Sequence, residues 1–466
     1  MTNKQTKTGK TAPVDNPVPS FWNADPRPLD DFRSTEDLPS DIDIVIIGSG
    51  IAGVGTAYHL LQDTSFKASI AILEARDPCS GATGRNGGHV KPDAFLNVPR
   101  NAKIYGAAAA AELAAYEASH VYAVKDLVEK EGLDCDFNIT RALDVFLDPE
   151  HAKQTEAAYR ELVKVGIVDL RDTSFTPKKD AERVSGVKGA QCCFSYTAAH
   201  LWPSKMIHQL LQLLLNKDVK LYSHTPVSSI SGTPDENGRW AVTTSRGLIK
   251  APKVIYATNG YTGELLPEYS RSIVPIRGIC SHISSTKGTD TPHLVNTYGI
   301  RFDARNNDYL IPRPDGSIIV GGARQRFWHN KDRWYGTVRD DELVDEAVSY
   351  FDDYMQRHFR GWEGSGAKVD SVWTGIMGYS ADFMPHVGGI PEKPGQFIIA
   401  GFTGHGMPQI LLSTKGLATM VRDGVPFENS GLPRIFKTTK ARISTKRSLM
   451  EENLEPLWRT GRESKL

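Results

Sequence analysis

The sequence predicts an α/β protein, with a Rossmann-type nucleotide-binding domain and an interleaved α+β substrate domain built on an antiparallel sheet. Three observations carry this prediction. A β-branched apolar run over residues 42–47 leads into a glycine-rich turn and a helical segment. A second apolar run, 69–73, ends in an acidic residue, and a strand, a glycine-rich turn and a helix recur near residue 400. Short apolar runs that alternate with helices are typical of parallel sheets covered on both faces.

Each glycine of the first turn has a physical task. Gly48 permits the tight turn, Gly50 lets the backbone approach a pyrophosphate, and Gly53 lets the helix pack closely on the strand. The helix N-terminus offers N–H donors and a positive dipole to phosphates, and Glu74 can hold ribose hydroxyls. A tight βαβ turn without a ligand is the alternative, and the motif leaves NAD and FAD both open. The residues assigned to a dinucleotide here are Gly48, Ser49, Gly50, Ile51, Ala52, Gly53, Glu74, Ala75 and Arg76.

The composition excludes several classes of protein. The chain has 466 residues, enough for two or three domains, and its 55 basic and 55 acidic residues predict no polyanionic partner such as nucleic acid. Its five cysteines are scattered without CxxC spacing, which argues against a disulfide framework and a zinc site, so we expect no metal. We also expect no membrane span and no signal peptide, because no apolar run is long enough and no charged-then-apolar start is present.

A second glycine-rich segment, 79–89, follows the strand that ends at Glu74. Four glycines in eleven residues leave few side chains to pack, which indicates close approach of the backbone to a ligand. A plain flexible loop is the alternative. The residues of this loop assigned to a ligand are Gly81, Ala82, Thr83, Arg85, Asn86, Gly87 and Gly88.

The remaining pattern gives an order of elements and domains. We expect helices at 102–131, 151–165, 201–215, 340–360 and 408–421, with Pro408 in the first turn of the last, and strands at 143–147, 219–222, 240–244, 248–249, 253–257, 309–312, 317–320 and 397–400. Residues 1–40 are expected to form an irregular arm that Phe21 and Trp22 pin to the body. The nucleotide-binding domain is expected at 41–98, 190–265 and 372–425, the substrate domain at 99–189 and 266–371, and an irregular tail at 426–466.

On these motifs, residues 41–425 resemble the FAD-dependent oxidoreductases of the D-amino-acid oxidase family, which includes sarcosine, glycine and γ-glutamylputrescine oxidases. The matching segments are 48–53 with Glu74, 81–88, 257–260, 275–278 and 401–406, and the sequence of 81–88 is most similar to the γ-glutamylputrescine oxidase branch. The resemblance implies FAD rather than NAD. It also implies hydride transfer from a carbon beside an amine nitrogen to flavin N5, hydrolysis of the imine, and reduction of O₂ to H₂O₂. The amine must react unprotonated, so the pocket should desolvate it.

The resemblance also implies site residues. The further cofactor-binding residues that it implies are Val227, Thr258, Asn259, Gly260, Gly401, Gly404, His405, Gly406 and Met407. The turn 401–406 would direct N–H groups and a helix dipole at the flavin N1/C2=O edge, although His405 can equally be a helix-start residue without a catalytic role. Arg324 is the first choice to clamp a substrate carboxylate. Arg277 reaches the flavin or has a structural role. The catalytic or substrate-contacting candidates are Tyr309, Arg324, Trp373, Tyr379 and His405, with Arg313 beside them, and each can alternatively be a packing or surface residue.

Attachment of the flavin is expected to be non-covalent. Segment 373–378 lacks the cysteine through which sarcosine-oxidase relatives tether flavin, which excludes that route and leaves His89 and Cys79 as alternative tethers.

The last three residues, Ser464, Lys465 and Leu466, form a peroxisomal address that an import receptor reads. This address agrees with a peroxide-forming oxidase and implies a eukaryotic source, with a coincidental terminus as the alternative. The expected small-molecule partners are an amine or amino acid and O₂. The rival functions are a flavin dehydrogenase of a hydroxy acid or polyol phosphate, a tailoring oxidoreductase on a larger metabolite, and a non-catalytic flavoprotein.

Overall fold

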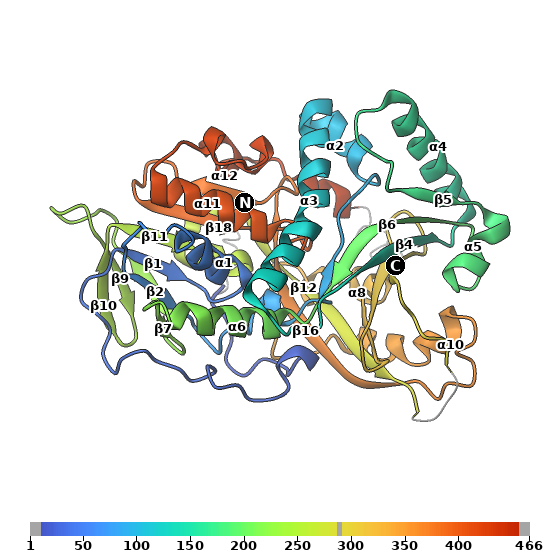
Figure 1. The fold of residues 1–466 in the computed structure, drawn as a ribbon, viewed down its shortest axis with the longest axis horizontal. Coiled ribbons are helices and arrows are strands. Elements are labelled where there is room, and N and C mark those ends of the chain that lie inside the picture. Colours follow the sequence, from blue (N-terminus) through green and yellow to red (C-terminus); the bar gives the residue numbers. More distant parts are fainter. Residues whose placement is uncertain (1–10, 287–290, 456–466) are drawn as a thin grey trace, which may run out of the picture.

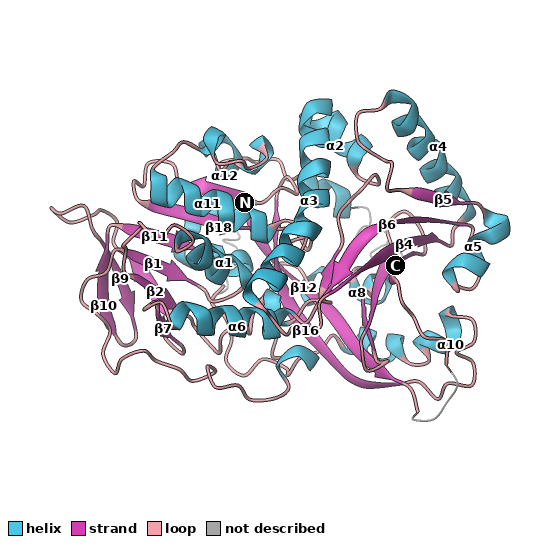
Figure 2. Cartoon of the chain, viewed as in Figure 1, coloured by secondary structure: helices cyan, strands magenta, loops and turns pink. Residues whose placement is uncertain are grey.

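The structure, a computed structural model, describes residues 11–286 and 291–455. Two sheet-based halves lie side by side (Figure 1), and the long strands β12 (Ile273–Ser284) and β16 (Lys368–Ser380) form one edge of the sheet of the second half. Helices α4 (Pro149–Val165) and α5 (Lys178–Ser185) lie at the outer side of the second half, whereas α3 (Ala107–Glu131) lies near the middle of the molecule (Figure 2). This arrangement agrees with the predicted fold class of a Rossmann-type domain and an interleaved substrate domain.

The first half is a six-stranded sheet in the order β17-β18-β11-β1-β2-β7. Strands β18 to β7 are parallel, and β17 is antiparallel to β18. Every residue of β1 and β2 is buried, as expected for strands covered on both faces. The bounds are β1 (Ile44–Ile47), β2 (Ile70–Leu73), β7 (Lys220–Tyr222), β11 (Lys253–Tyr256), β17 (His386–Gly389) and β18 (Gln396–Ala400).

The two faces of this sheet bury different partners. Helices α1 (Ile51–Leu60), α6 (Pro203–Leu215) and α11 (Ile410–Asp423) pack with Ile44, Ile46 and their neighbours on one face. On the other face, Val45 and Ile47 pack against a three-stranded sheet of β8 (Val227–Ile230), β9 (Trp240–Thr244) and β10 (Gly247–Ala251). The expected hairpin over 240–249 is therefore present and covers the sheet.

The second half is a nine-stranded sheet in the order β16-β12-β15-β14-β13-β4-β6-β3, with β5 beside β6. Its pairs are antiparallel except β13 with β4. The remaining bounds are β3 (His89–Val90), β4 (Asn138–Phe146), β5 (Ser174–Thr176), β6 (Cys192–His200), β13 (Thr297–Arg301), β14 (Asn307–Pro312) and β15 (Ile318–Gly321). Residues 190–200 and 372–380, expected in the nucleotide-binding domain, thus supply β6 and β16 to this sheet instead.

Two predicted helices are interrupted. The helix expected at 102–131 is divided at Gly106, whose φ of 89° separates α2 (Val98–Tyr105) from α3 (Ala107–Glu131). The helix expected at 340–360 is three short pieces, because Asp352 is extended and Asp353 has a φ of 52°. Pro408 lies before α11 rather than in its first turn. The other α-helices are α4 (Pro149–Val165), α5 (Lys178–Ser185), α7 (Thr262–Leu265), α8 (Arg324–Phe327), α9 (Asp345–Val348), α10 (Tyr354–His358) and α12 (Lys440–Ile443).

The described parts of the N-terminal arm and of the C-terminal segment are more ordered than the sequence predicts. Trp22, in a single 3₁₀ turn (Phe21–Asn23), is fully buried, which confirms that this residue pins the arm. In the expected tail, Phe436, Met450 and Leu454 are buried in the two cores, so residues 431–455 pack on the body. The expectation of an irregular tail is wrong for this part, because apolar residues are spaced among its charges. Segment 464–466 lies outside the described residues.

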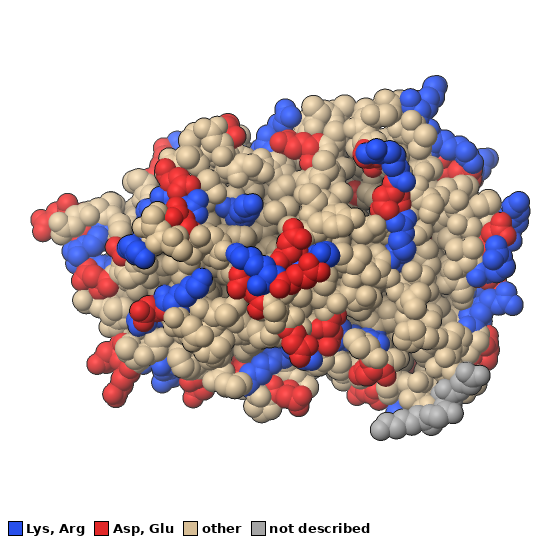
Figure 3. All heavy atoms as spheres, in the orientation of Figure 1, with Lys and Arg blue, Asp and Glu red and all other residues tan. Residues whose placement is uncertain are grey.

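The surface carries no single-signed patch on the face drawn in Figure 3, where acidic and basic side chains are interspersed. Across residues 11–286 and 291–455, no helix combines the length and apolar character needed to span a bilayer. The same residues contain no cluster of three or more His, Cys, Asp or Glu side chains arranged to hold a metal ion.

Candidate active site

A large cavity of about 1050 Å³ lies between the two halves. Its lining begins at the turn after β1 and ends among side chains of the nine-stranded sheet, including Tyr309 and Arg301. Parallel sheets bind ligands beyond the carboxyl ends of their strands, and this cavity opens there. Its volume slightly exceeds that of a pocket for one drug-sized ligand, so it can hold an extended cofactor together with a small substrate.

The first glycine motif is shaped as the sequence predicts. Gly48 has a φ of 106°, and a Cβ atom there would lie 2.8 Å from the carbonyl oxygen of Ala257. A Cβ atom on Gly53 would lie 1.9 Å from the carbonyl oxygen of Gly48, which is the close packing of helix on strand. Both positions therefore require glycine, one for its conformation and both for space.

Glu74 is held at the edge of the cavity with room to accept more hydrogen bonds. The Ser49 N–H and hydroxyl donate to its Oε2 at 2.9 and 2.7 Å, and the Arg76 N–H donates to its Oε1 at 3.0 Å. A carboxylate offers about four lone-pair sites. Three are used, so the carboxylate is fixed in orientation and can still accept from a ribose hydroxyl.

The glycine-rich loop 79–88 combines packing with access to the cavity. Cβ atoms on Gly84 and Gly87 would lie 2.0 Å from the Cys79 carbonyl oxygen and 2.3 Å from the Tyr309 ring, so these two glycines permit packing. A Cβ atom on Gly81 would meet nothing within 4 Å, so that part of the loop faces open space. The Thr83 hydroxyl accepts from the Ile51 N–H at 3.0 Å and so occupies one of the donors expected for phosphates.

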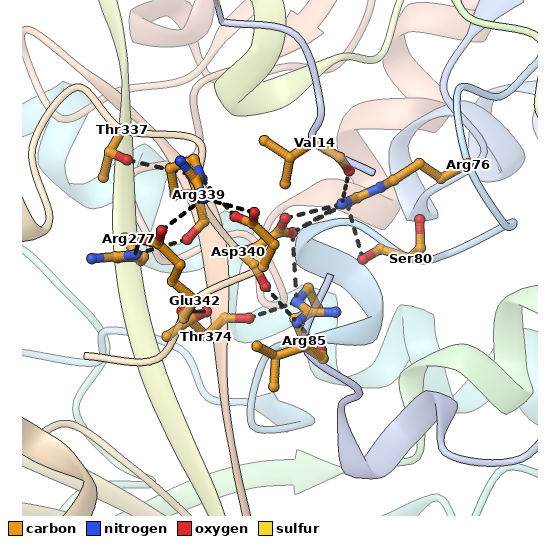
Figure 4. Close-up of polar contacts among 12 residues, drawn as sticks. Val14, Arg76, Ser80, Arg85, Arg277, Thr337, Arg339, Asp340, Glu342 and Thr374 are labelled. Carbon is orange, nitrogen blue, oxygen red and sulfur yellow. Dashed lines mark hydrogen bonds and ion pairs between the residues drawn. The ribbon is translucent and has the colours of Figure 1, made fainter. Parts of the chain in front are cut away.

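A buried ion cluster stands behind this loop (Figure 4). Asp340, whose side chain is inaccessible to solvent, lies 3.0 Å from Arg76 Nη1 and 3.7 Å from Arg85 Nε. Arg85 Nε also donates to the Thr374 carbonyl at 2.6 Å. Both arginines line the cavity, as predicted, but their guanidinium groups are committed to Asp340 and to backbone carbonyls. Their guanidinium groups therefore shape the wall, and contact of the two residues with the cofactor stays a prediction.

The N-terminal arm covers the outside of the same loop. The Ser20 hydroxyl donates to the Gly84 carbonyl at 2.6 Å, and the Trp22 indole N–H donates to the Asn86 carbonyl. Val18 N–H donates to the Asp340 carbonyl at 2.8 Å and ties the arm to the ion cluster. Phe21 stacks on His282 with ring centroids 4.2 Å apart. Earlier residues of the arm, Ala12, Pro13 and Asp15, line the cavity itself.

The glycine-rich turn 401–406 forms an ion pair with helix α3 that the sequence does not reveal. His405 Nε2 lies 2.8 Å from Oε2 of Glu117, a buried residue of α3, and Gln409 Nε2 donates to the other carboxylate oxygen at 2.6 Å. Burial opposes the charged imidazole, but the Glu117 carboxylate prevails and raises the pKa of His405. His405 therefore carries positive charge at the cavity more readily than an ordinary histidine.

Three of the predicted substrate-side residues, Tyr309, Arg324 and Tyr379, line the cavity. The Tyr309 hydroxyl is 3.0 Å from Cys280 Sγ, and Tyr309 packs where Gly87 and Gly321 leave space. Arg324 is half-buried, with its guanidinium carbon 4.6 Å from the centre of the Trp328 ring. Among the described residues, the Arg324 side chain has no hydrogen-bond acceptor or ion-pair partner, so its donors are available to a ligand.

Three other predicted positions have structural roles. Trp373 is fully buried, does not line the cavity, and donates from its indole to the Arg85 carbonyl at 2.9 Å. Arg313 is also outside the lining and pairs with Asp136 at 2.5 Å. Arg277 lines the cavity, yet it donates to the Arg333 and Arg339 carbonyls, both at 2.8 Å. Further predicted residues that do not line the cavity are Ser49, Gly53, Gly88, Gly260 and Gly401.

The residues present fit an FAD-sized ligand. The motif at Gly48, the fixed Glu74 and the open space beside Gly81 form one continuous lining. Tyr261 also faces this cavity, and its buried hydroxyl has no hydrogen-bond partner in the part of the chain that the structure describes. A buried hydroxyl without a partner is costly, which indicates that a ligand completes the wall.

Comparison with known proteins decides the family. Residues 43–420 match the FAD dependent oxidoreductase family. The chain belongs to this family. The choice of FAD over NAD made from the sequence is thereby confirmed.

Relatives of this FAD dependent oxidoreductase are distant but nearly full-length. The chain is 22% identical to a glycine oxidase of Bacillus licheniformis, over 78% of this chain and 89% of that protein. It is 21% identical to a γ-glutamylputrescine oxidoreductase of Escherichia coli (strain K12), over 82% and 83% of the two chains. The crystal structure of glycine oxidase from Geobacillus kaustophilus superposes with a TM-score of 0.67 at 17% identity, covering 86% of this chain and 99% of that one. That likeness shows the shared fold.

Proposed function

We propose that this FAD-dependent oxidoreductase is an oxidase of an amine or amino acid, which forms an imine and H₂O₂. The observation that carries the proposal is Arg324, a half-buried cation at the cavity whose donors have no partner in the described residues. A guanidinium group in this state matches a carboxylate with two parallel hydrogen bonds. The names of the two relatives, a glycine oxidase and a γ-glutamylputrescine oxidoreductase, support an amine nitrogen at the reacting carbon.

The residues around the cavity have distinct tasks in this proposal. Bound FAD would accept a hydride from the carbon next to the amine nitrogen, and O₂ would take up the electrons as H₂O₂. Arg324 holds the substrate carboxylate, while the aromatic walls of Tyr309 and Tyr379 exclude water and favour the neutral amine over the ammonium ion. His405, whose cationic form Glu117 favours, would supply positive charge to a reduced flavin ring, which gathers negative charge.

The test is anaerobic addition of a panel of primary and secondary amines and amino acids to the yellow protein, followed by aerobic peroxide assays. We expect loss of the flavin absorbance band with one class of compound and stoichiometric peroxide in air. Bleaching by a hydroxy acid or polyol phosphate, with none by any amine, would overturn the proposal. Bleaching by an amine without peroxide in air would replace the oxidase by a dehydrogenase.

The role of Arg324 has its own test. Arg324→Gln removes the charge-assisted pair, which we expect to raise KM by about 10- to 150-fold, because hydrogen bonds to charged groups contribute roughly 1.5–3 kcal/mol. Arg326→Gln is the matched control, since Arg326 is exposed and outside the lining, with its guanidinium carbon 5.7 Å from the centre of the Tyr350 ring. Equal kinetics for the two variants would remove Arg324 from the site.

We further propose that the flavin is bound without a covalent tether. Cys79 lines the cavity, but burial raises the pKa of its thiol and so disfavours the nucleophilic thiolate. His89 Nε2 is occupied at 2.8 Å by the Thr297 hydroxyl. Acid precipitation should release FAD into the supernatant, whereas flavin that stays with the protein would identify a tether.

Delivery to the peroxisome through Ser464, Lys465 and Leu466 stays a prediction. The relatives named above are bacterial proteins and give no information on it. A fluorescent protein fused to the N-terminus of the chain should collect in peroxisomes of a eukaryotic cell. One alanine added after Leu466 should disperse it, and an unchanged distribution would contradict the prediction.

A further inference from the structure

A second basic cluster lies at the cavity, away from the nucleotide-binding motif. Arg301 is the last residue of β13, and Lys91 follows directly after β3. Both side chains line the cavity, each with 17% of its side-chain surface exposed, and neither has a role in the reaction described above. Asp144 of β4 lies between them.

The charges of this cluster do not cancel. Asp144 Oδ2 is 3.1 Å from Lys91 Nζ, and its Oδ1 is 3.5 Å from Arg301 Nη2. The Tyr196 hydroxyl donates to Asp144 at 2.6 Å. Burial opposes ionisation of Asp144, yet Lys91 and Arg301 lower its pKa to about 2, so it remains an anion. Among Lys91, Arg301 and Asp144, two cations and one anion leave one net positive charge.

Some hydrogen-bond donors of Arg301 and Lys91 have no acceptor among the described residues. The Nε atom of Arg301 is buried and has no acceptor within the described residues. Lys91 has three N–H donors, of which Asp144 accepts one. A buried donor without an acceptor costs about 1–3 kcal/mol, and a bound acceptor group removes that cost. Asp144 holds the two cations in place, and a further acid group would satisfy them.

The register of the sheet relates this cluster to Arg324. Gly299 of β13 and Gly321 of β15 both pair with Tyr309 of the strand between them. Arg301 comes two residues after Gly299, and Arg324 three residues after Gly321, so the two arginines follow parallel strands at the same edge. Two strand spacings place their backbones on the order of 10 Å apart. Both side chains line the same cavity from these two backbone positions, so one small molecule with an acid group at each end can contact both.

We propose that Arg301 and Lys91, positioned by Asp144, form a second anion-binding subsite that recognises a distal acid group of the substrate. The substrate class is then an amine that carries two acid groups, one held at Arg324 and the other at Arg301. This inference rests on the proposed oxidation of an amine or amino acid in the same cavity. It adds a requirement that a simple amine or a monocarboxylic amino acid does not meet.

The test uses unreactive ligands, so that it does not depend on turnover. The holoenzyme is titrated with pentanoate and with glutarate, two five-carbon acids that differ in one carboxylate, and binding is followed by the change in the flavin absorbance spectrum. We expect glutarate to bind at least tenfold more tightly, as a charge-assisted hydrogen bond of about 1.5 kcal/mol or more requires. Equal affinities would overturn the subsite.

Variants identify the residue responsible. Arg301→Gln should remove the preference for glutarate while the Lys91–Asp144 pair keeps the region folded, and Arg301→Lys should restore part of it. Arg305→Gln is the matched control, because Arg305 also lines the cavity but is exposed. Glutarate preference that survives in Arg301→Gln, or is lost equally in Arg305→Gln, contradicts the assignment.

The two proposals fail in different ways. If no amine bleaches the flavin but glutarate still binds more tightly than pentanoate through Arg301, the proposed reaction is wrong and the anion subsite stands. If monocarboxylic amino acids are oxidised and glutarate has no advantage, the reaction stands and the subsite is wrong.

Discussion

Replacing Asp340 with asparagine tests the ion cluster behind the glycine-rich loop. The side chains of Asp340, Arg76 and Arg85 are 0%, 8% and 2% exposed, so water cannot compensate either arginine after the change. The asparagine keeps the shape and one acceptor oxygen but removes the charge that both arginines share. The bond from the Val18 N–H to the backbone of residue 340 is unaffected, so the variant isolates the electrostatic contribution.

The expected loss of stability follows from this burial. Removing one partner of a buried ion pair costs about 3–5 kcal/mol, because an uncompensated charge stays in a medium of low polarity. The remaining amide oxygen can still accept one hydrogen bond, so we expect the lower end, about 3 kcal/mol. At roughly 2–4 °C per kcal/mol, the Tm of the holoenzyme should fall by about 6 °C or more.

The assay is thermal release of FAD followed by flavin fluorescence, with the rate of FAD dissociation at 25 °C as a second readout. Asp341→Asn is the matched control, because Asp341 pairs at 2.8 Å with Arg339, whose side chain is 50% exposed. Surface pairs contribute about 0–1 kcal/mol, so that variant should melt close to the wild type. Equal Tm values for the two variants would refute the reasoning.

Three further predictions concern the cavity wall. Gly53→Ala places a Cβ atom 1.9 Å from the Gly48 carbonyl oxygen, so this variant should fail to form the FAD site. In the control, Gly81→Ala, the new Cβ atom meets nothing within 4 Å, so the Tm of the apoprotein should be unchanged. A yellow Gly53→Ala protein with wild-type Tm would contradict this prediction. Glu117 raises the pKa of His405 although burial opposes the charge, so the ion pair stabilises fully below the ordinary value of about 6.5 and is lost as the pH rises through the raised pKa. Between pH 6 and 9 the wild type should therefore lose more Tm than His405→Gln, and parallel curves would exclude the pair as a source of stability. Trp22→Ala deletes a fully buried side chain, which should cost about 3–5 kcal/mol and speed FAD dissociation, and an unchanged dissociation rate would show that the arm does not retain the cofactor.

The parts of the fold that could be predicted from the sequence are those whose cause is local. Strands β1, β2, β11 and β18 are short apolar runs, and Gly48 and Gly53 are required by backbone geometry within a few residues. The expected helix at 340–360 failed for the opposite reason. The apolar residues of this segment do pack into the core, and three short helical turns are enough to give them helical spacing. The turns do not join into one helix, because Asp353 has a left-handed backbone conformation.

The ion pairs of the site could not be predicted from local sequence patterns. Arg76 and Asp340 are separated by 264 residues, and Glu117 and His405 by 288, so no spacing in the sequence connects them. The sequence therefore placed Arg76, Arg85 and His405 at the cavity, but it could not supply the carboxylates that fix what these side chains do. Arg301 was missed because its partners, Lys91 and Asp144, come together only when β3 and β4 join one sheet.

The hydrogen bond from Arg85 to the Thr374 carbonyl joins residues 289 positions apart, so it can form only long after the ribosome has made Arg85. At about 5–20 residues per second, a ribosome needs roughly 15–60 s to progress from the glycine-rich loop to its supporting strand. Until β11 (Lys253–Tyr256) is made, part-way through that interval, β1 and β2 exist without this neighbour on the other side of β1. The growing chain thus exposes an unpaired strand edge and lacks one wall of its FAD site, so the cofactor can be captured firmly only after most of the protein has been made.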